Sequence, residues 1–356
     1  MKTKKRRFYR AIWLFIIAVL VASHANAQIK VVDQDDNMAV SYASIFDDAT
    51  GKVLGLTSST GEIPMKLSAE TTISIQHINY QPLTIKVGDI KGDTIRLASR
   101  DYQVGEVAVS KEKHDYLRIK FYVRQYSLIN GQVAAVDQTI CYGYYPYDDH
   151  SKRPTCQILS QKKLRNEAAL AGQKFALTAF ATMSDPLLFA HFDVEPFYET
   201  LKDGKRYQQM KDGIKRRTIF VREDKATQHC QLVIDSALVE KPFSVPLFGV
   251  SLSHGYGSAN FSTHGKTPTL AGLENAIYSL RLTHNKTQSY VNLYCELYVL
   301  GVDYADKQDF AQLKKQLKEQ KKSGAQPSFQ CPNADIPPFN KYVQTAMKGM
   351  TEPKDE

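Results

Sequence analysis

The sequence is poor in tryptophan and cysteine, and after residue 22 it has no long apolar run. Its one tryptophan is Trp13, so 20 tyrosines and 16 phenylalanines supply the other aromatic side chains. The five cysteines are an odd number, and no two form a C-x-x-C pair, which argues against a zinc site. Strand alternation places Cys295 in a core as an unpaired thiol. The remaining cysteines, whose pairing stays open, are Cys141, Cys156, Cys230 and Cys331.

Residues 1–27 have the three parts of a secretory signal peptide. Basic residues at 2–10 precede an apolar run at 11–22, and Ala25-Asn26-Ala27 is a small-x-small cleavage site. The apolar run is shorter than the about 20 residues that cross a bilayer. We therefore expect an exported protein, periplasmic or associated with the outer membrane, whose mature chain begins at Gln28 and has no transmembrane segment.

Most of the net positive charge lies in this signal. Six of the 46 lysines and arginines and none of the 37 acids are in residues 1–27, so 40 minus 37 leaves a charge of +3 for the rest. A nucleic-acid-binding protein concentrates far more basic charge on one surface. The charge therefore argues against nucleic acid as a partner.

Residues 28–110 read as a series of short strands divided by turn residues, with no helical period between them. This spacing is typical of an all-β sandwich. The strands are expected at 29–32, 40–46, 53–57, 63–67, 71–76, 83–87, 94–97 and 104–109.

Ordered motifs in this region resemble the carboxypeptidase regulatory-like family. They are Val32-Asp33, VSYASI at 40–45, STGEI at 59–63, IQHINY at 75–80 and GEVAV at 105–109. The resemblance implies a transthyretin-like β-sandwich, an accessory module at the N-terminus of exported envelope proteins of Bacteroides-type bacteria. The family usually has glycine before the tyrosine. Here Asn79 stands there, and we expect it to adopt a positive φ.

Charged residues 111–115 are predicted to form a linker to a second domain at 116–356. Residues 116–126, YLRIKFYVRQY, alternate as a half-buried strand, and residues 276–283 and 288–301 read as a hairpin. We expect one helix over 161–182 with Ser160 as its N-cap, and a polar helix over 305–322. The second domain is therefore predicted to be α+β, an antiparallel sheet with helices on one face.

Two strands of this domain carry rows of tyrosine and arginine. Guanidinium groups suit carboxylates and phosphates, and tyrosine rings add a stacking surface. The ligand favoured by such a face is a partner protein with an acidic surface or an anionic glycan or peptide. The alternative is a solvated or packed face with cross-strand aromatic pairs. The candidate binding residues are Arg118, Tyr122, Arg124, Tyr290, Tyr294 and Tyr298.

The chain has no H-E-x-x-H, G-x-S-x-G, P-loop or dinucleotide motif, so we predict no cofactor or metal. Three short elements follow the order of a serine hydrolase: Ser160-x-x-Lys163, Ser258-x-Asn260 and Lys322-Ser-Gly324. His254, His264 and His284 match no metal-site spacing. We interpret the protein as a non-catalytic envelope binding protein. The alternatives are an envelope hydrolase and a half-barrel carrier of lipid or lipoprotein, which needs an apolar cavity between sheet and helices.

Overall fold

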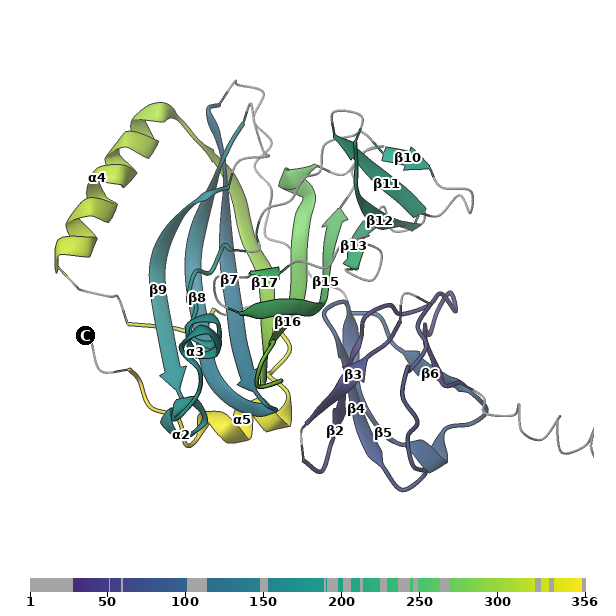
Figure 1. Cartoon of the computed structure of the whole chain (residues 1–356). Helices are drawn as coiled ribbons and strands as arrows, with labels where there is room; N and C mark the ends of the chain where they lie inside the picture. Colours follow the sequence, from purple (N-terminus) through teal and green to yellow (C-terminus); the bar gives the residue numbers. More distant parts are fainter. Residues whose placement is uncertain are drawn as a thin grey trace, which may run out of the picture. The chain divides into compact units, whose positions relative to one another are not determined.

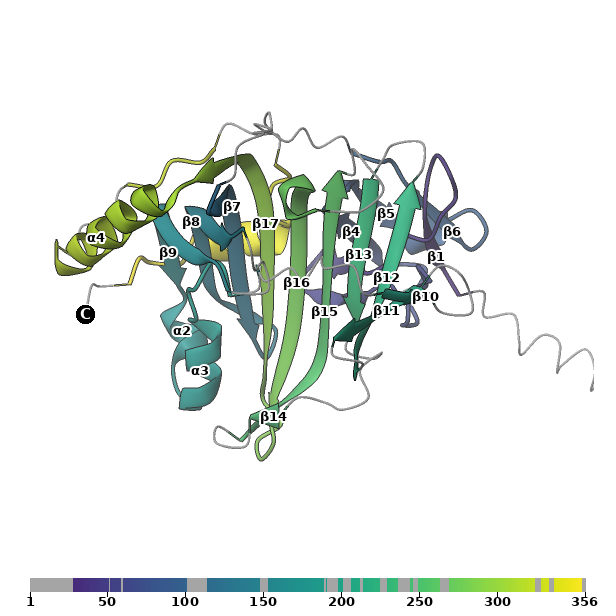
Figure 2. The same cartoon turned by 90° about the horizontal axis from the view of Figure 1, so that it is seen from above.

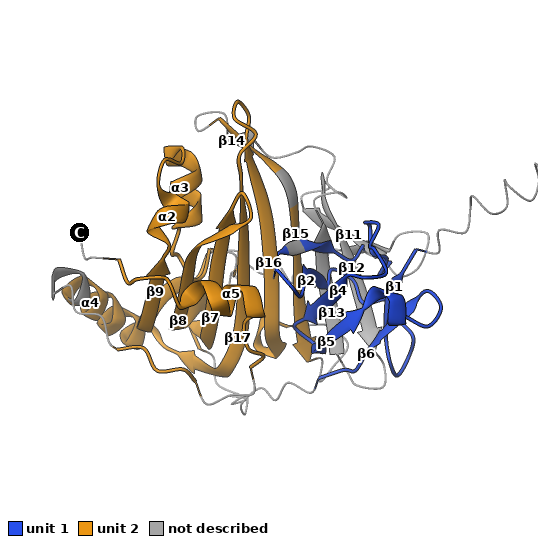
Figure 3. Ribbon diagram, turned by 90° about the horizontal axis from the view of Figure 1, so that it is seen from below, with its two compact units in different colours: residues 1–100 blue, residues 101–356 orange. Residues whose placement is uncertain are grey.

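The computed structural model describes residues 28–353 with the gaps given below. For the strands β10 to β14, between residues 198 and 245, it describes the backbone but not the side chains. The predicted signal peptide and the predicted strand at 104–109 lie outside the described residues. The chain divides into two compact units, residues 1–100 and 101–356 (Figure 3). Residues left undescribed within the range are 51, 59, 101–113, 148–152, 189, 191–197, 201–205, 212–213, 225–228, 236–243, 246–248, 263–268, 324–327 and 333–335.

The first unit is a pair of small sheets over one apolar core. A parallel pair joins β1 (Lys30–Asp33) to β6 (Thr94–Leu97). An antiparallel sheet has the order β3-β2-β4-β5, and its core side is lined by alternate residues such as Ile73 and Ile75. Its strands are β2 (Ser44–Asp47), β3 (Val53–Leu56), β4 (Thr72–His77) and β5 (Tyr80–Lys86), followed by the short helix η1 (Val87–Asp89) (Figure 1).

Several predictions for this unit need correction. Residues 63–67 form no strand, because the chain there makes only an isolated bridge between Glu62 and Lys30. Asn79 does not have a positive φ: it joins β4 to β5 in a turn in which its N–H donates to His77 Nδ1 at 3.2 Å. Tyr80 is buried, and its hydroxyl donates to Asp33 Oδ2 at 2.9 Å. Tyr80 therefore ties β5 to the end of β1.

The turn before residue 62 explains one of the sequence motifs. Gly61 has φ of 77°, and a Cβ there would collide with the carbonyl oxygen of Val31. The Gly61 N–H donates to the carbonyl of Ser58 at 3.0 Å, and the Glu62 N–H donates to the Ser58 hydroxyl at 3.1 Å. Only glycine fits this tight approach to β1.

The second unit is built on one large antiparallel sheet, which Figures 1 and 2 show as long curved strands side by side. Among the described residues it has eleven strands in the order β10-β11-β12-β13-β15-β16-β17-β7-β8-β9, with β14 paired to β15. The strands are β7 (Tyr116–Ile129), β8 (Gln132–Pro146), β9 (Thr155–Arg165), β10 (Tyr198–Thr200), β11 (Arg206–Lys211), β12 (Ile214–Asp224), β13 (His229–Asp235), β14 (Ser244–Val245), β15 (Val250–Ser262), β16 (Leu273–His284) and β17 (Tyr290–Ala305).

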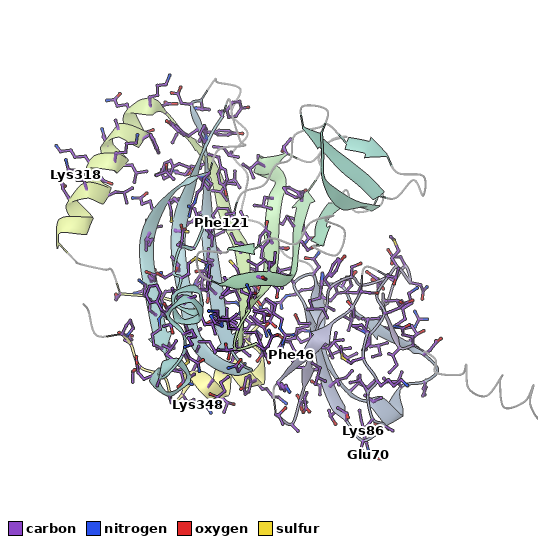
Figure 4. The ribbon with its side chains drawn as sticks, in the orientation of Figure 1. Phe46, Glu70, Lys86, Phe121, Lys318 and Lys348 are labelled. Atoms are coloured by element: carbon purple, nitrogen blue, oxygen red, sulfur yellow. The ribbon has the colours of Figure 1, made fainter. Side chains whose placement is uncertain are left out.

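Strand alternation works as predicted on β7. Its odd-numbered residues, including Leu117 and Phe121, enter the main core with Leu297 and Val299 of β17 (Figure 4). Cys295 lies in the same core, as the sequence predicts. The hairpin expected around residues 284–287 is also present, as β16 and β17.

Helices cover both faces of the sheet, so the expectation of one covered face is wrong. The helices α2 (Glu167–Leu170) and α3 (Phe175–Ala181) lie on the Phe121 face, where Leu177 packs with Val291 and Leu293. On the opposite face, α4 (Lys307–Ser323) packs Phe310 and Leu313 against tyrosines of β7 and β8. The other helices that the structure describes in this unit are η4 (Leu270–Gly272) and α5 (Lys341–Met347). None of the described helices has the length and apolarity to span a membrane.

The predicted helix over 161–182 is wrong. Residues 155–165 form β9, hydrogen-bonded to β8, and Ser160 is a buried strand residue opposite Ile140. The helical segments begin only at Asn166, whose side chain accepts from the Ala169 N–H at 3.2 Å and so caps α2. This segment is a strand because it pairs with β8, about 20 residues earlier in the chain. The local sequence pattern fits a helix and does not show that pairing.

The predicted linker at 111–115 lies partly outside the described residues. Its last two residues are held by the second unit. The Asp115 carboxylate accepts from the Lys307 N–H at 3.0 Å, and the Asp115 carbonyl accepts from the Tyr147 N–H at 2.8 Å. His114 stacks on Tyr304 at 4.9 Å. These two residues therefore anchor the start of β7 and of α4.

Candidate functional site

The even-numbered side chains of β7 project to the face opposite Phe121, which we call the tyrosine–arginine face. Registered pairing brings the matching side chains of β17 beside them. Tyr122 pairs with Tyr298, Arg124 with Glu296 and Tyr126 with Tyr294. Since paired residues project to one side, two of the tyrosine rows expected from the sequence meet here.

Arg124 lies at the centre of this face and is buried. Its Nε donates to Glu296 Oε2 at 2.7 Å, its Nη2 also donates to that oxygen, and Nη2 donates to Tyr298 Oη at 2.9 Å. Burial acts to lower the pKa of the guanidinium, but Glu296 and Tyr298 beside it outweigh that effect and raise the pKa. The positive charge is therefore neutralised inside the protein.

The tyrosines around Arg124 stack across the strands. The rings of Tyr126 and Tyr294 are 4.7 Å apart, and those of Tyr122 and Tyr298 are 6.3 Å apart. The Tyr122 hydroxyl donates to Gln138 Oε1 at 2.7 Å, and burial is the main cause of its raised pKa. These four rings form a packed layer.

Residues near the C-terminus cover that layer. Phe329 stacks on Tyr122 with 6.2 Å between ring centroids, and Phe339 lies over the Arg124 guanidinium at 4.5 Å. Pro337 accepts from Arg124 Nη1 through its carbonyl at 2.5 Å. Farther on, Thr351 pairs with Arg165 at the end of β9. Four of the six candidate residues are buried, namely Tyr122, Arg124, Tyr294 and Tyr298, and the C-terminal segment contacts two of them, Tyr122 and Arg124.

Tyr290 and Arg118 lie at opposite ends of this covered region. Tyr290 is partly exposed, with the Arg281 guanidinium 3.9 Å above its ring. Arg118 keeps 30% of its side chain exposed. It donates to both carboxylate oxygens of Asp303 at 2.6 Å and lies 4.8 Å over the ring of Tyr142. The hydrogen bonds to Asp303 are the main cause of a raised Arg118 pKa.

Two lysines lie on the same face as Arg118: Lys120 lies between Arg118 and Tyr122 on β7, and Lys162 of β9 is level with Arg124. Lys120 is paired with Tyr142 of β8, and Lys162 of β9 is paired with Gln138, whose side chain faces Tyr122. Both lysines are partly exposed, and neither makes an ion pair with a residue that the structure describes. We call this set the basic band: Arg118, Lys120, Tyr142 and Lys162.

The band was only partly visible in the sequence. Lys120 belongs to the predicted alternating strand, but Lys162 falls in the segment predicted to be a helix, so the sequence pattern does not place it on this face. On the other flank, α4 adds exposed lysines such as Lys314, whose Nζ lies 4.8 Å over Phe310. Lys318 is on the side of α4 turned away from the sheet (Figure 4). In Figures 1 and 2 this helix extends outward past β9.

The alternative constellations are not assembled by the described residues. Ser160 and Lys163 lie three apart on a strand, so their side chains project to opposite faces. His284 holds a turn by accepting from the Thr287 N–H at 3.2 Å, and His264 lies outside the described residues. No group of three metal-binding side chains occurs in the part of the chain that the structure describes.

A small hollow lies beneath the end of α3, on the Phe121 face. Its walls include Leu293 and Met183 but also Gln125, Ser127 and Asp137. Ser127 donates to the Ala181 carbonyl at 2.8 Å, and Asp137 is ion-paired with Arg165. The lining of this hollow is therefore partly polar and partly apolar.

No protein-family model matches the sequence, and a search of curated proteins finds no match.

Proposed function

We propose that the protein is a non-catalytic, exported cell-envelope protein that binds an anionic ligand through the basic band of its second unit. The observation that carries this is the pair of partly exposed lysines, Lys120 and Lys162, on one face with Arg118 and the partly exposed Tyr142. Partly exposed cations with no acidic partner among the described residues can pair with a ligand's anionic groups.

The spacing of the band favours an extended ligand. Arg118 and Lys120 are two residues apart, which is about 7 Å on a strand. Lys162 lies one strand beyond β8, and its partner Gln138 is four residues from Tyr142, or about 13 Å along the strand. A chain with repeated carboxylates or sulfates reaches all three cations, whereas a single small anion reaches one. The ligand is therefore an anionic glycan or an acidic protein segment.

The first unit is proposed to be an accessory module of the carboxypeptidase regulatory-like type. Support comes from the order of motifs in residues 32–109 and from the two small sheets packed over one core. Export is supported by residues 1–27, and in this reading the mature chain begins at Gln28.

The test is a binding measurement with two charge-matched variants. Lys120→Gln combined with Lys162→Gln removes two charges from the band, and Lys120→Gln combined with Lys163→Gln removes the same number but leaves Lys162. Each variant is titrated with dextran sulfate and with a poly-glutamate peptide, and neutral dextran serves as the control ligand. Exposed charge contacts contribute roughly 0.5–1 kcal/mol each, so the variant that lacks Lys162 should bind about two- to fivefold more weakly than the variant that lacks Lys163.

Binding to dextran sulfate alone would identify a glycan-type ligand, and binding to poly-glutamate alone an acidic protein segment. The proposed site would be contradicted if both variants bound the polyanions with equal affinity. It would also be contradicted if the protein bound neutral dextran as tightly as it binds the polyanions.

A further inference from the structure

Two cysteines lie on neighbouring strands of the second unit and face the same core. Cys141 is in β8 and is fully buried, and Cys156 is in β9 and is partly buried against the same cluster. In the register of these strands Cys156 pairs with Gly143, and Cys141 pairs with Ile158. The cysteines are therefore diagonal neighbours across one strand pair. Both thiols are unbridged in the structure.

The two thiols pack against the same core cluster. The residue directly opposite Cys156 is Gly143, which contributes no side chain, and Leu187, Phe121 and Tyr145 fill the space above it. The thiol of Cys156 is the leading cause of a raised pKa at Cys141, ahead of burial, which places the two groups side by side. A disulfide needs Cβ atoms about 4 Å apart, whereas the Cβ atoms of diagonal neighbours are typically somewhat less than about 7 Å apart. The two strands must therefore move closer together for the bond to form.

The β9 strand has the freedom to close this remaining gap. It is the last strand of the sheet, and a register shift occurs between Ile140 and Cys141 of its partner. A terminal strand with a bulge bends and twists more easily than a strand held on both sides.

No other cysteine competes for Cys156. Cys295 is on β17, two strands from β8, and Cys230 is on β13, five strands away. Strands are spaced by about 4.8 Å, so both cysteines exceed the roughly 7 Å limit on Cα separation for a disulfide. Cys331 is beside Tyr122 on the tyrosine–arginine face, which is the opposite side of the sheet.

We propose that Cys141 and Cys156 form a disulfide bond that fastens the terminal strand β9 to β8 when the protein meets an oxidising disulfide. The partly exposed Cys156 thiolate attacks the donor disulfide, breaks its S–S bond and releases one thiolate. Cys141 then loses its proton and attacks the Cys156 sulfur, which releases the second donor thiol. The protein loses two electrons and two protons, and the donor disulfide is reduced to two thiols.

The test uses the purified, reduced mature protein and oxidised glutathione. Trypsin cuts after Arg124, Lys152 and Lys162, so Cys141 and Cys156 fall in separate peptides, 125–152 and 153–162. Non-reducing mass spectrometry should find these two peptides linked, with two hydrogens fewer than their sum. The oxidised protein should also have a Tm several degrees higher than the reduced protein, because the bond constrains residues 142–155 in the unfolded chain.

The controls separate this pair from the other thiols. Cys331→Ser and Cys295→Ala should leave the linked peptide in place, whereas Cys156→Ser should abolish both the link and the Tm difference. The proposal is overturned if folded protein yields only a glutathione adduct on Cys156, or if either peptide is linked to Cys230 or Cys331. Neither outcome depends on ligand binding at the basic band.

Discussion

Arg124 of β7 and Glu296 of β17 form an ion pair at directly opposed positions of the sheet, and their side chains are only 5% and 15% exposed. Phe339 and the Pro337 carbonyl close over the pair. The partially exposed counterpart is Arg118 with Asp303, on the same two strands, at 30% and 41% exposure. Strands β7 and β17 therefore hold one buried and one partly exposed arginine–carboxylate pair.

This difference predicts unequal costs for two similar substitutions. Arg124→Met should lower the free energy of unfolding by about 3–5 kcal/mol, because it leaves the Glu296 carboxylate buried without a partner. Arg118→Met, at the solvated pair, should cost at most about 1 kcal/mol. Combining Arg124→Met with Glu296→Leu should restore most of the loss, since an apolar pair avoids the desolvation of both charges. Urea unfolding measures all three, and equal costs for the two single variants would refute the assignment.

Buried tyrosines predict a loss of stability in alkali. Tyr145 is fully buried and donates to the Ala190 carbonyl at 2.8 Å, and burial raises its pKa well above the usual 10.0. Because the pKa of Tyr145 is higher in the folded protein than in the unfolded chain, the unfolded tyrosine ionises first as pH rises. The contribution of Tyr145 to the free energy of unfolding is therefore complete below pH 10 and is lost as pH rises toward its folded-state pKa. Tyrosinate absorbance and circular dichroism, recorded together, should show Tyr145 ionising only as the protein unfolds.

The matched variants are Tyr145→Phe and Tyr147→Phe, the second at a ring that is 46% exposed. Tyr145→Phe should reduce the pH dependence of the free energy of unfolding above pH 10 more than Tyr147→Phe does. Absorbance from Tyr145 that appears while the circular dichroism is still native would contradict the prediction.

The N-cap residue Asn166 is predicted to stabilise the helix α2 that follows β9. Asn166→Ala should reduce the free energy of unfolding by about 1 kcal/mol, because the Ala169 N–H loses its capping acceptor. The same change removes the hydrogen bond from Asn166 to the Val133 carbonyl at 2.9 Å. Asn166→Asp, which retains a capping oxygen, should cost less than Asn166→Ala in equilibrium unfolding. A larger cost for Asp than for Ala would show that the bond to Val133 dominates.

Local patterns in the sequence determined the elements whose period is unambiguous. The alternation of residues 116–126 predicted both the strand and the division of its side chains, with Phe121 in the core and Arg124 on the other face. The same reasoning placed Cys295 correctly in the core. The segment at 155–165 was missed because its apolar residues fit a helical stripe as well as a strand, and only its ladder with β8 separates the two.

The sequence by itself therefore determined that the protein is rich in β-structure and which side chains of its clearest strands share a face, because side-chain alternation is a local property of the backbone. Only the tertiary structure decided what lies on each face. Glu296 is 172 residues from Arg124, and Pro337 is 213 residues away, so neither neighbour is visible in the strand's own pattern. Long-range pairing and the path of the C-terminal segment buried Tyr122 and Arg124 and left Arg118, Lys120 and Lys162 partly open to solvent.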